Sequence, residues 1–293
     1  MVALSIMIEG QDGLTWSRWQ ALVAAAEDFG YAGLYRSDHF TNPEPPDKDA
    51  LEMIVSLTWL ADHTQRIAFG PLVAPLSFRD PRLLARQAAA LDDLSGGRMI
   101  LGVGAGWQAR EHGVYGYDLG DTAARMGRFE EGLAVITRLL RSDEPVTFAG
   151  QFYQLHDATL LPRPQRSGGP RILVGGNGQR RTLALAARYA DVWNCFSVSA
   201  AGFRERTQTL DRLLIAAGRT PADVRRTVML RAYLGRSDEE LEWRLAWRHD
   251  DSEFRGLSLA ETVEALRTQK HALIGTPEQM IAGIQTYAAA GAE

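Results

Sequence analysis

Short apolar runs alternate with longer amphipathic segments along most of the chain. The apolar runs are rich in Val, Ile, Leu and aromatic residues, as expected for strands buried on both faces. They lie at about residues 2–8, 32–37, 66–73, 98–104, 171–176, 192–197 and 227–235. Helical patterns lie at about residues 15–29, 49–63, 81–94, 122–141, 178–189, 200–217 and 277–290. The alternation predicts βα units with right-handed crossovers and a parallel sheet.

Repeated βα units without a linker between two halves favour a closed barrel over an open sheet. We therefore predict an α/β protein of the TIM (β/α)8 type, with a single domain over residues 1–293. Two segments interrupt the alternation. Residues 146–156 alternate and turn at Ala149-Gly150, which predicts an inserted β-hairpin. The polar stretch 237–270, which contains Trp243 and Trp247, predicts a helical insertion.

Composition and charge exclude several classes of protein. The chain is 45% apolar and 23% charged, and its net charge of −4 with no basic stripe argues against a nucleic-acid partner. A lone cysteine, Cys195, excludes an internal disulfide framework and a cysteine metal cluster. The histidines show no metal-ligand spacing, so we predict no metal. Without a long apolar span or signal peptide, the sequence predicts a cytoplasmic protein with no membrane partner.

Polar and glycine-rich segments follow three of the predicted strands. Ser37-Asp38-His39-Phe40 follows the second strand, Gly104-Ala105-Gly106-Trp107 the fourth, and Gly175-Gly176-Asn177-Gly178 the fifth. The active sites of barrel enzymes are built at the carboxyl ends of the strands. We therefore predict that the three segments share one mouth, with the acid and imidazole of the first segment in it.

Each glycine segment leaves two interpretations open. The segment around Gly104 and Gly106 departs from the dinucleotide fingerprint, because its third glycine comes one residue early. It provides either close strand packing or a backbone that a flat cofactor ring can approach. The segment after the fifth strand, followed by Arg180 and Arg181, predicts a phosphate site at a helix N-terminus. The alternative is a glycine turn with two solvated arginines.

Five segments together resemble the luciferase-like monooxygenase superfamily, in the branch that uses the deazaflavin coenzyme F420. They are Gly33–Phe40, Phe78–Pro81, Gly97–Trp107, Gly175–Gly178 and Arg188–Asn194. The resemblance covers nearly the whole chain. It implies a TIM barrel that binds flavin or deazaflavin across its mouth, a small-molecule substrate and a homodimer. Ser37-Asp38-His39 favours F420 over FMN, so hydride transfer is expected instead of oxygen activation.

The resemblance also implies roles for particular residues. Asp38 and His39 would touch the ring system. His39 would orient the ring or move a proton, and Asp38 would hold the His39 tautomer or bond the ring itself. A non-prolyl cis peptide near Leu72-Val73-Ala74 would back the ring, next to Gly104 and Gly106. The phosphate end would lie at Gly175, Gly176, Asn177 and Gly178.

The chain departs from the family pattern at two places. Sugar-phosphate dehydrogenases of this branch carry a glutamate where this chain has Trp107. Glu111 and His112 follow one helical turn later, either as substitute acids, as lining of the site or on a solvated face. Substrate contacts are expected from Trp107, Glu111, Trp193 and Asn194, with an apolar wall and a buried aromatic core as the two interpretations of the tryptophans.

The second departure concerns the end of the chain. The sequence stops after the helix at 277–290, where the family would continue, so we expect a barrel that lacks its last strand and helix. Two alternatives to an F420-dependent oxidoreductase therefore stay open. One is an FMN-dependent monooxygenase of the same fold, and the other is a non-catalytic flavin-binding relative with an incomplete barrel.

Overall fold

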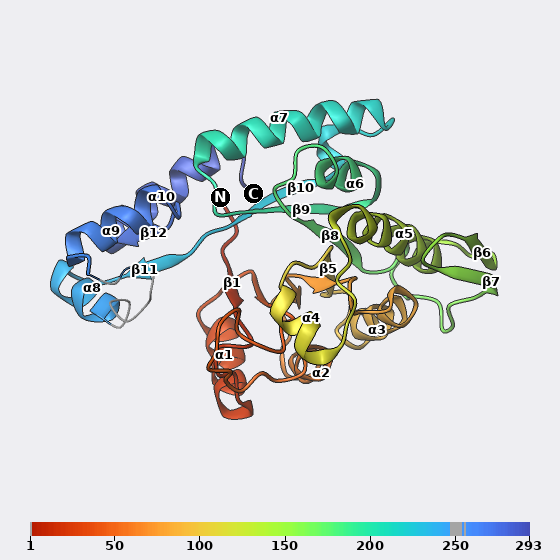
Figure 1. The fold of residues 1–293 in the computed structure, drawn as a ribbon, viewed down its shortest axis with the longest axis horizontal. Coiled ribbons are helices and arrows are strands. Elements are labelled where there is room, and N and C mark those ends of the chain that lie inside the picture. Colours follow the sequence, from red (N-terminus) through yellow and green to blue (C-terminus); the bar gives the residue numbers. More distant parts are fainter. Residues whose placement is uncertain (1, 247–253, 255) are drawn as a thin grey trace. The chain divides into compact units, whose positions relative to one another are not determined.

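The computed structural model describes residues 2–246, 254 and 256–293 (Figure 1), so Trp247 lies outside the described residues. The described chain divides into two compact units. The larger is Ala3–Trp193, and the smaller comprises Asn194–Glu293 together with Val2. Each unit is described on its own, and one barrel domain over residues 1–293 stays a prediction.

Parallel strands alternate with helices throughout the larger unit. The strands are β1 (Ser5–Ile8), β2 (Gly33–Arg36), β3 (Ala68–Pro71), β4 (Ala74–Pro75), β5 (Ile100–Gly104) and β8 (Arg171–Gly175). The helices that follow them are α1 (Trp16–Asp28), α2 (Met53–His63), α3 (Pro81–Leu94), α4 (Ala109–Tyr115), α5 (Thr122–Arg141) and α6 (Thr182–Tyr189). The pairing orders are β1-β2-β3 and β4-β5-β8, and a bridge between Phe69 and Met99 links the two runs. The predicted α/β fold with a parallel sheet is confirmed.

Capping residues and apolar spacing explain where the helices begin and which face they bury. The side chain of Asp80 accepts the N–H of Arg82 at 2.8 Å ahead of α3, and Pro81 occupies the first turn. Helix α1 buries Trp19, Val23 and Ala26 at intervals of three and four residues. The indole Nε1 of Trp19 donates to the carbonyl oxygen of Ser56 at 2.9 Å, which fixes α1 to α2.

The strand register places the carboxyl ends of the larger unit's strands at one level. Arg36 of β2 pairs with Pro71 of β3, and Pro75 of β4 pairs with Gly104 of β5. Val103 of β5 pairs with Val174 of β8. The segments that follow these strands therefore leave the sheet at the same edge, which is what positions the candidate site.

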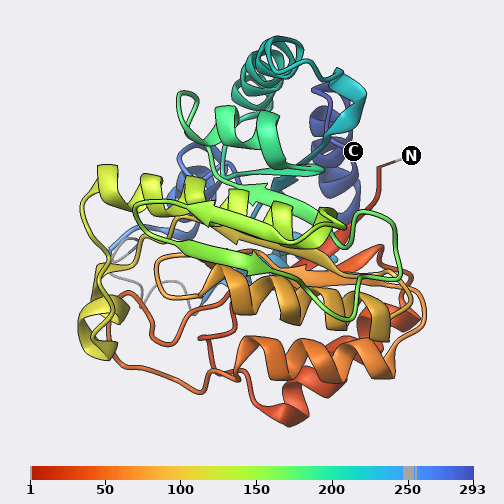
Figure 2. The same cartoon turned by 90° about the vertical axis from the view of Figure 1, so that its right-hand side faces the viewer.

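An antiparallel hairpin of β6 (Val146–Ala149) and β7 (Gln154–Ala158) lies against α5 (Figure 2). The carboxylate of Glu131 on α5 accepts the backbone N–H groups of Gln151 and Phe152, each at 2.8 Å. This one carboxylate therefore satisfies both backbone N–H groups of the hairpin turn.

Two predicted boundaries are wrong. The helix expected at 178–189 begins only at Thr182, because the glycines at 176 and 178 are poor helix formers and the first has a φ of 139°. The strand expected at 227–235 divides into β10 (Arg225–Met229) and β11 (Ala232–Leu234). It divides because β10 lies beside β9 (Val192–Phe196), whereas β11 pairs with β12 (Leu273–Gly275).

The smaller unit contains a strand and helix that complete the predicted alternation. Its helices are α7 (Ala200–Ala216), α8 (Asp238–Leu245), α9 (Leu259–Thr268) and α10 (Pro277–Ala289), with a 3-10 turn at Pro221–Asp223. Strand β12 precedes α10 and packs on an apolar cluster that includes Leu245, Phe254 and Leu266. The expectation of a missing last strand and helix is not confirmed, because sequence reading recognised α10 but not the three-residue strand ahead of it. None of the described helices combines the length and apolar character needed to cross a bilayer.

Candidate active site

His39 and Glu111 form a hydrogen-bonded pair at the carboxyl end of β2. The Oε1 and Oε2 atoms of Glu111, on α4, lie 3.0 and 3.1 Å from Nδ1 of His39. The same carboxylate accepts the backbone N–H of Phe40 at 3.1 Å and is only 1% exposed. An ionised carboxylate only accepts hydrogen bonds, so Nδ1 carries the proton. The other ring nitrogen, Nε2, makes no hydrogen bond to a described residue and is available to a ligand.

The surroundings of His39 favour its protonated form. Burial is the largest influence and lowers the pKa of the imidazole. The hydrogen bond and charge of Glu111 act in the opposite direction, and the charges of Glu9 and Asp38 add to them. Together they raise the pKa of His39 above its ordinary value, which suits a group that gains and returns a proton.

The hydroxyl of Ser37 ties the loop after β2 to the loop after β1. It accepts the backbone N–H of Gly10 at 2.8 Å and donates to Oε1 of Gln11 at 2.8 Å. Ser37 is buried, so these bonds form away from water. The serine thus holds the backbone that carries His39, a role that the sequence pattern did not reveal.

Asp38 is bonded to an arginine instead of to His39. Its buried carboxylate accepts from Nε and Nη2 of Arg79 at 2.8 and 2.7 Å, and the same guanidinium donates to Glu52 at 2.8 Å. Burial raises the pKa of Asp38, and Arg79 opposes that rise. The expectation that Asp38 holds the His39 tautomer is therefore wrong, because the tautomer is set by Glu111. The arginine comes from the segment Phe78–Pro81, which had suggested family resemblance but no role.

The Leu72–Val73 peptide bond is cis, as the family resemblance implied. Val73 is half-buried and packs on a small apolar cluster of Ile100, Leu173 and Val192. Ala74, the third residue of the expected segment, is buried in β4.

The glycines after β5 and at the end of β8 make room for protein side chains. A Cβ at Gly104 would lie 2.5 Å from Cγ2 of Val73, and one at Gly175 would lie 2.8 Å from Cγ1 of Val73. Gly106 has a φ of 82°, and a Cβ there would lie 2.1 Å from Oγ of Ser77. Of the two interpretations of these glycines, the structure supports close packing. They place Val73 at the meeting point of β3, β5 and β8.

The loop after β8 differs from its predicted form. Because α6 begins at Thr182, the glycine segment does not open the helix, and added Cβ atoms at Gly176 and Gly178 would lie 3.0 and 2.9 Å from the Thr182 side chain. Asn177 is half-buried between them, and Arg180 is exposed. A phosphate site on this loop therefore stays a prediction without the support of a helix N-terminus.

Two expected substrate contacts are core residues. Trp193 is completely buried, and its Nε1 donates to the carbonyl oxygen of Gly176 at 2.9 Å. It fixes the loop after β8 and presents no surface to a substrate, so its assignment to a substrate wall is wrong. Asn194 is buried in the smaller unit, where its Nδ2 donates to Oγ1 of Thr227 at 2.9 Å.

Trp107 is instead the exposed aromatic residue beside His39. Its side chain is 60% exposed, and its ring meets the imidazole edge-on with 5.6 Å between the ring centres. His112, on α4 with Glu111, is buried, with Nδ1 2.7 Å from the Gln108 carbonyl oxygen and Nε2 2.8 Å from Oγ of Ser77. Neither Glu111 nor His112 lies on a solvated face, so that interpretation is excluded.

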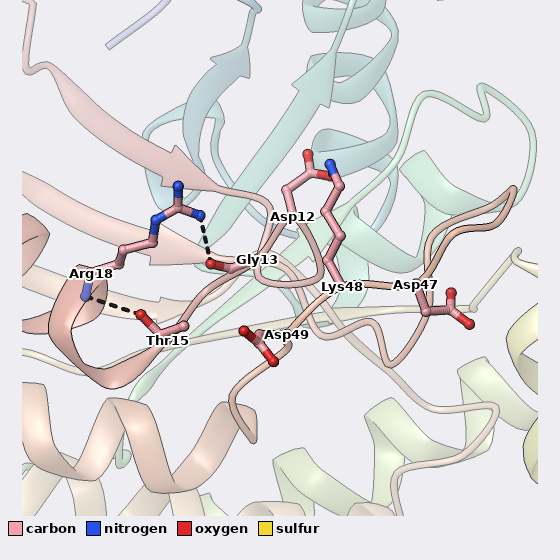
Figure 3. A pocket seen from close by; sticks show the side chains of 7 residues that line it. All are labelled: Asp12, Gly13, Thr15, Arg18, Asp47, Lys48 and Asp49. Carbon is pink, nitrogen blue, oxygen red and sulfur yellow. Dashed lines mark hydrogen bonds and ion pairs between the residues drawn. The ribbon is translucent and has the colours of Figure 1, made fainter.

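A separate open pocket of about 740 Å³ lies between the loops after β1 and β2 (Figure 3). Its lining is charged and consists of Asp12, Gly13, Thr15, Arg18, Asp47, Lys48 and Asp49. Nζ of Lys48 lies 3.6 Å from Asp12, and Arg18 donates to the Gly13 carbonyl oxygen at 2.7 Å. None of the predicted site residues lines this pocket. Within the described ranges, no three His, Cys, Asp or Glu side chains are grouped to hold a metal ion.

The sequence model of the luciferase-like monooxygenase family matches residues 4–293. An F420-dependent glucose-6-phosphate dehydrogenase of Kineococcus radiotolerans is 34% identical over 209 residues, which are 70% of this chain and 60% of that protein. The 4-hydroxyprotoasukamycin monooxygenase of Streptomyces nodosus subsp. asukaensis is 31% identical over 279 residues, 92% of this chain and 69% of that protein. The fold matches an F420-dependent secondary alcohol dehydrogenase with a TM-score of 0.82 at 18% identity, covering 99% of this chain and 91% of that one.

Proposed function

Because the chain belongs to the luciferase-like monooxygenase family, we propose that it is an F420-dependent oxidoreductase, which transfers a hydride between the deazaflavin and a small organic substrate. Relatives named as F420-dependent glucose-6-phosphate dehydrogenases support the cofactor, at 34% identity over 209 residues and 29% over 283 residues. The chain spans 60% of the first of these relatives, so its activity is inferred chiefly from its own residues.

One observation carries the proposal: an imidazole held by a buried carboxylate, with its second nitrogen free, at the carboxyl end of a parallel strand. Glu111 fixes Nδ1 of His39, and Nε2 is available for a reacting oxygen. The adjacent strand, β3, is followed by Leu72 and Val73, whose side chains keep part of their surface exposed. A proton-transfer group and an apolar backing for a flat ring therefore leave neighbouring strands at the same edge of the sheet.

The residues of the site fit a flat redox cofactor. Val73 is wedged against Gly104 and Gly175, and both Leu72 and Val73 keep part of their surface exposed. We assign the cofactor ring to this surface, with the side chain of His39 facing the ring. The phosphate end is assigned to the loop of Gly176, Asn177 and Gly178 with Arg180 and Arg181 beside it. When bound, deazaflavin supplies or accepts the hydride.

The chain's own residues then accept and return the substrate's hydroxyl proton. In the oxidising direction, Nε2 of His39 accepts the hydroxyl proton of the substrate as the hydride leaves carbon; in the reducing direction it returns that proton. Glu111 stabilises the imidazolium that forms, because its carboxylate is 3.0 Å from Nδ1. Asp38 and Arg79 hold the loop that carries His39, so the imidazole keeps its position during the reaction.

The test is a cofactor-binding comparison followed by a turnover assay. Titration of the purified protein with F420, followed by fluorescence, should give saturable binding that is tighter than the binding of FMN. His39→Ala should keep F420 binding and lose turnover by about 10²–10⁴-fold, the usual contribution of a positioned acid or base. Phe29→Ala, a change at an exposed residue of the larger unit, is the matched control and should keep both. Absence of F420 binding would contradict the proposal.

A second candidate is an FMN-dependent monooxygenase of the same fold. The 31% identity to 4-hydroxyprotoasukamycin monooxygenase over 279 residues favours it. Oxygen consumption with reduced FMN, without binding of F420, would select this function. The third candidate is a non-catalytic flavin-binding relative, which would bind the cofactor without measurable turnover in either the wild type or His39→Ala.

Assembly and location complete the proposal. The homodimer implied by the family resemblance predicts a mass of twice 32.3 kDa by light scattering. A cytoplasmic location is also proposed and is tested by cell fractionation.

A further inference from the structure

An exposed indole lies beside His39, and the cations near His39 are already paired with carboxylates or backbone oxygens. From these we propose that the substrate is an uncharged alcohol or carbonyl compound with an apolar, ring-sized body, and not a sugar phosphate. The inference rests on the proposed hydride transfer and specifies the substrate of the same site.

Trp107 is the first observation. The core tryptophans Trp19 and Trp193 are fully buried, and each donates its Nε1 proton to a backbone carbonyl oxygen. Trp107 differs in both respects, because it is 60% exposed and its Nε1 has no hydrogen-bond partner among the described residues. Its ring stands edge-on to His39 at 5.6 Å. An exposed aromatic side chain beside an imidazole with a free nitrogen offers an apolar wall to whatever reacts there.

The apolar surface continues past Trp107 along α4. Phe40 packs on Phe78 and Tyr115, with ring centres 4.7 and 5.0 Å apart. Val114 and Tyr115 are more than half exposed. The segment from Trp107 to Tyr115 therefore carries apolar side chains at the surface next to Glu111, on the element that orients His39.

Charge is the second, independent observation. The carboxylate of Glu111 is in direct contact with His39, and that of Asp38 is held by Arg79, so neither is a cation that could receive an anionic group. A phosphate ester carries close to two negative charges near neutral pH. Such a group beside His39 would need free cations to balance its charge, whereas an uncharged substrate would not.

The nearby cations are already engaged. Arg79 is bonded to Asp38 and Glu52. Arg36 is buried and donates to the Leu51 carbonyl oxygen and the Ser56 hydroxyl. Arg110 is bonded to both carboxylate oxygens of Asp47, at 2.7 and 2.8 Å.

The exposed arginines Arg180 and Arg181 follow β8. This strand is three positions from β2 in the order β2-β3-β5-β8, counted across the Phe69–Met99 bridge. These two residues are assigned to the cofactor, because they follow a strand that is not adjacent to β2.

The reaction balances with these groups alone. In oxidation, the C–H bond at the carbinol carbon breaks and its electron pair leaves with the hydrogen as a hydride, which reduces F420. The O–H bond breaks as its proton passes to Nε2 of His39, and the carbonyl double bond forms. The proton is then released and reduced F420 takes up one proton, so one alcohol and one oxidised F420 give one carbonyl compound and one reduced F420.

The test compares substrates on the F420-loaded protein. The probes are 1-phenylethanol and cyclohexanol, with glucose 6-phosphate and glucose as the charged and uncharged polar comparisons. We expect reduction of F420 with both apolar alcohols and none with glucose 6-phosphate. Trp107→Ala should raise the KM for 1-phenylethanol about tenfold with unchanged F420 binding, and Trp107→Phe should restore most of the loss. Phe29→Ala, another exposed aromatic residue, should leave the KM unchanged.

The outcomes separate this inference from the proposed function. A lower KM for glucose 6-phosphate than for the alcohols would overturn the inference while supporting F420-dependent oxidation. An unchanged KM in Trp107→Ala would also overturn it. Calorimetric titration with acetophenone covers the case in which no alcohol is turned over. Failure of acetophenone to bind the F420-loaded protein overturns the inference, whereas failure of F420 to bind overturns the proposed function itself.

Discussion

The carboxylate of Glu111 holds Nδ1 of His39 from a position 72 residues further along the chain. The bond joins the loop after β2 to the helix after β5, and one carboxylate also accepts the N–H of Phe40. This arrangement sets the tautomer of the imidazole and biases it toward the protonated form. Proton transfer at this site therefore depends on Glu111 as well as on His39.

Replacing Glu111 by Gln should move the pH dependence of turnover to lower pH. The hydrogen bond and charge of Glu111 are the largest of the influences that raise the pKa of His39, so their loss should lower that pKa. The midpoint of the kcat profile should fall, with F420 binding retained. Glu130→Gln, an exposed change on α5, is the control and should leave the midpoint in place. An unchanged midpoint in Glu111→Gln would show that another group titrates.

The same pair should make folding stability pH-dependent. The pKa of His39 is higher in the folded chain than the value of about 6.5 expected when unfolded. Its contribution is then fully present below the unfolded pKa and is lost as pH rises through the folded pKa. The difference in free energy of unfolding between the wild type and His39→Gln should shrink as the pH rises from below the unfolded pKa through the folded pKa, as measured by urea denaturation. A difference that grows over that interval would contradict the assignment.

Asp38→Asn should destabilise the fold without moving the pH midpoint of turnover. It leaves the guanidinium of Arg79 with Glu52 as its remaining carboxylate partner, in a partly buried position. Breaking a buried ion pair typically costs about 3–5 kcal/mol. Glu130→Gln, which breaks the exposed pair with Arg188, should cost less than about 1 kcal/mol. A shift of the midpoint in Asp38→Asn would return a proton-transfer role to Asp38.

Gly104→Ala should be destabilising by about 1–3 kcal/mol, because its Cβ would lie 2.5 Å from Cγ2 of Val73. Val73→Ala in the same chain should recover part of this loss, which a double-mutant cycle measures. Gly113→Ala on α4 is the matched control, since nothing lies within 4 Å of its Cβ. That change should be neutral or stabilise the protein by up to about 1 kcal/mol. Additive effects of the Gly104 and Val73 changes would contradict the contact.

Periodicity predicted the alternation of elements because each strand and helix buries its face through local spacing. Periodicity does not predict which distant segments contact one another. Asp38 and Arg79 are 41 residues apart in sequence, and only the fold brings them into contact. The glycines were recognised, but the side chain that each accommodates comes from another strand, as Val73 does for Gly104. Strand β12 could not be predicted from the sequence, because a run of three residues is too short to show a period of two.

The most direct test of the central claim is an anaerobic F420 reduction assay with 1-phenylethanol and the purified protein. We expect loss of the oxidised deazaflavin absorbance, formation of one acetophenone per F420 reduced, and loss of both in His39→Ala, which still binds F420. An absence of F420 binding, together with oxygen consumption on addition of reduced FMN, would contradict the account.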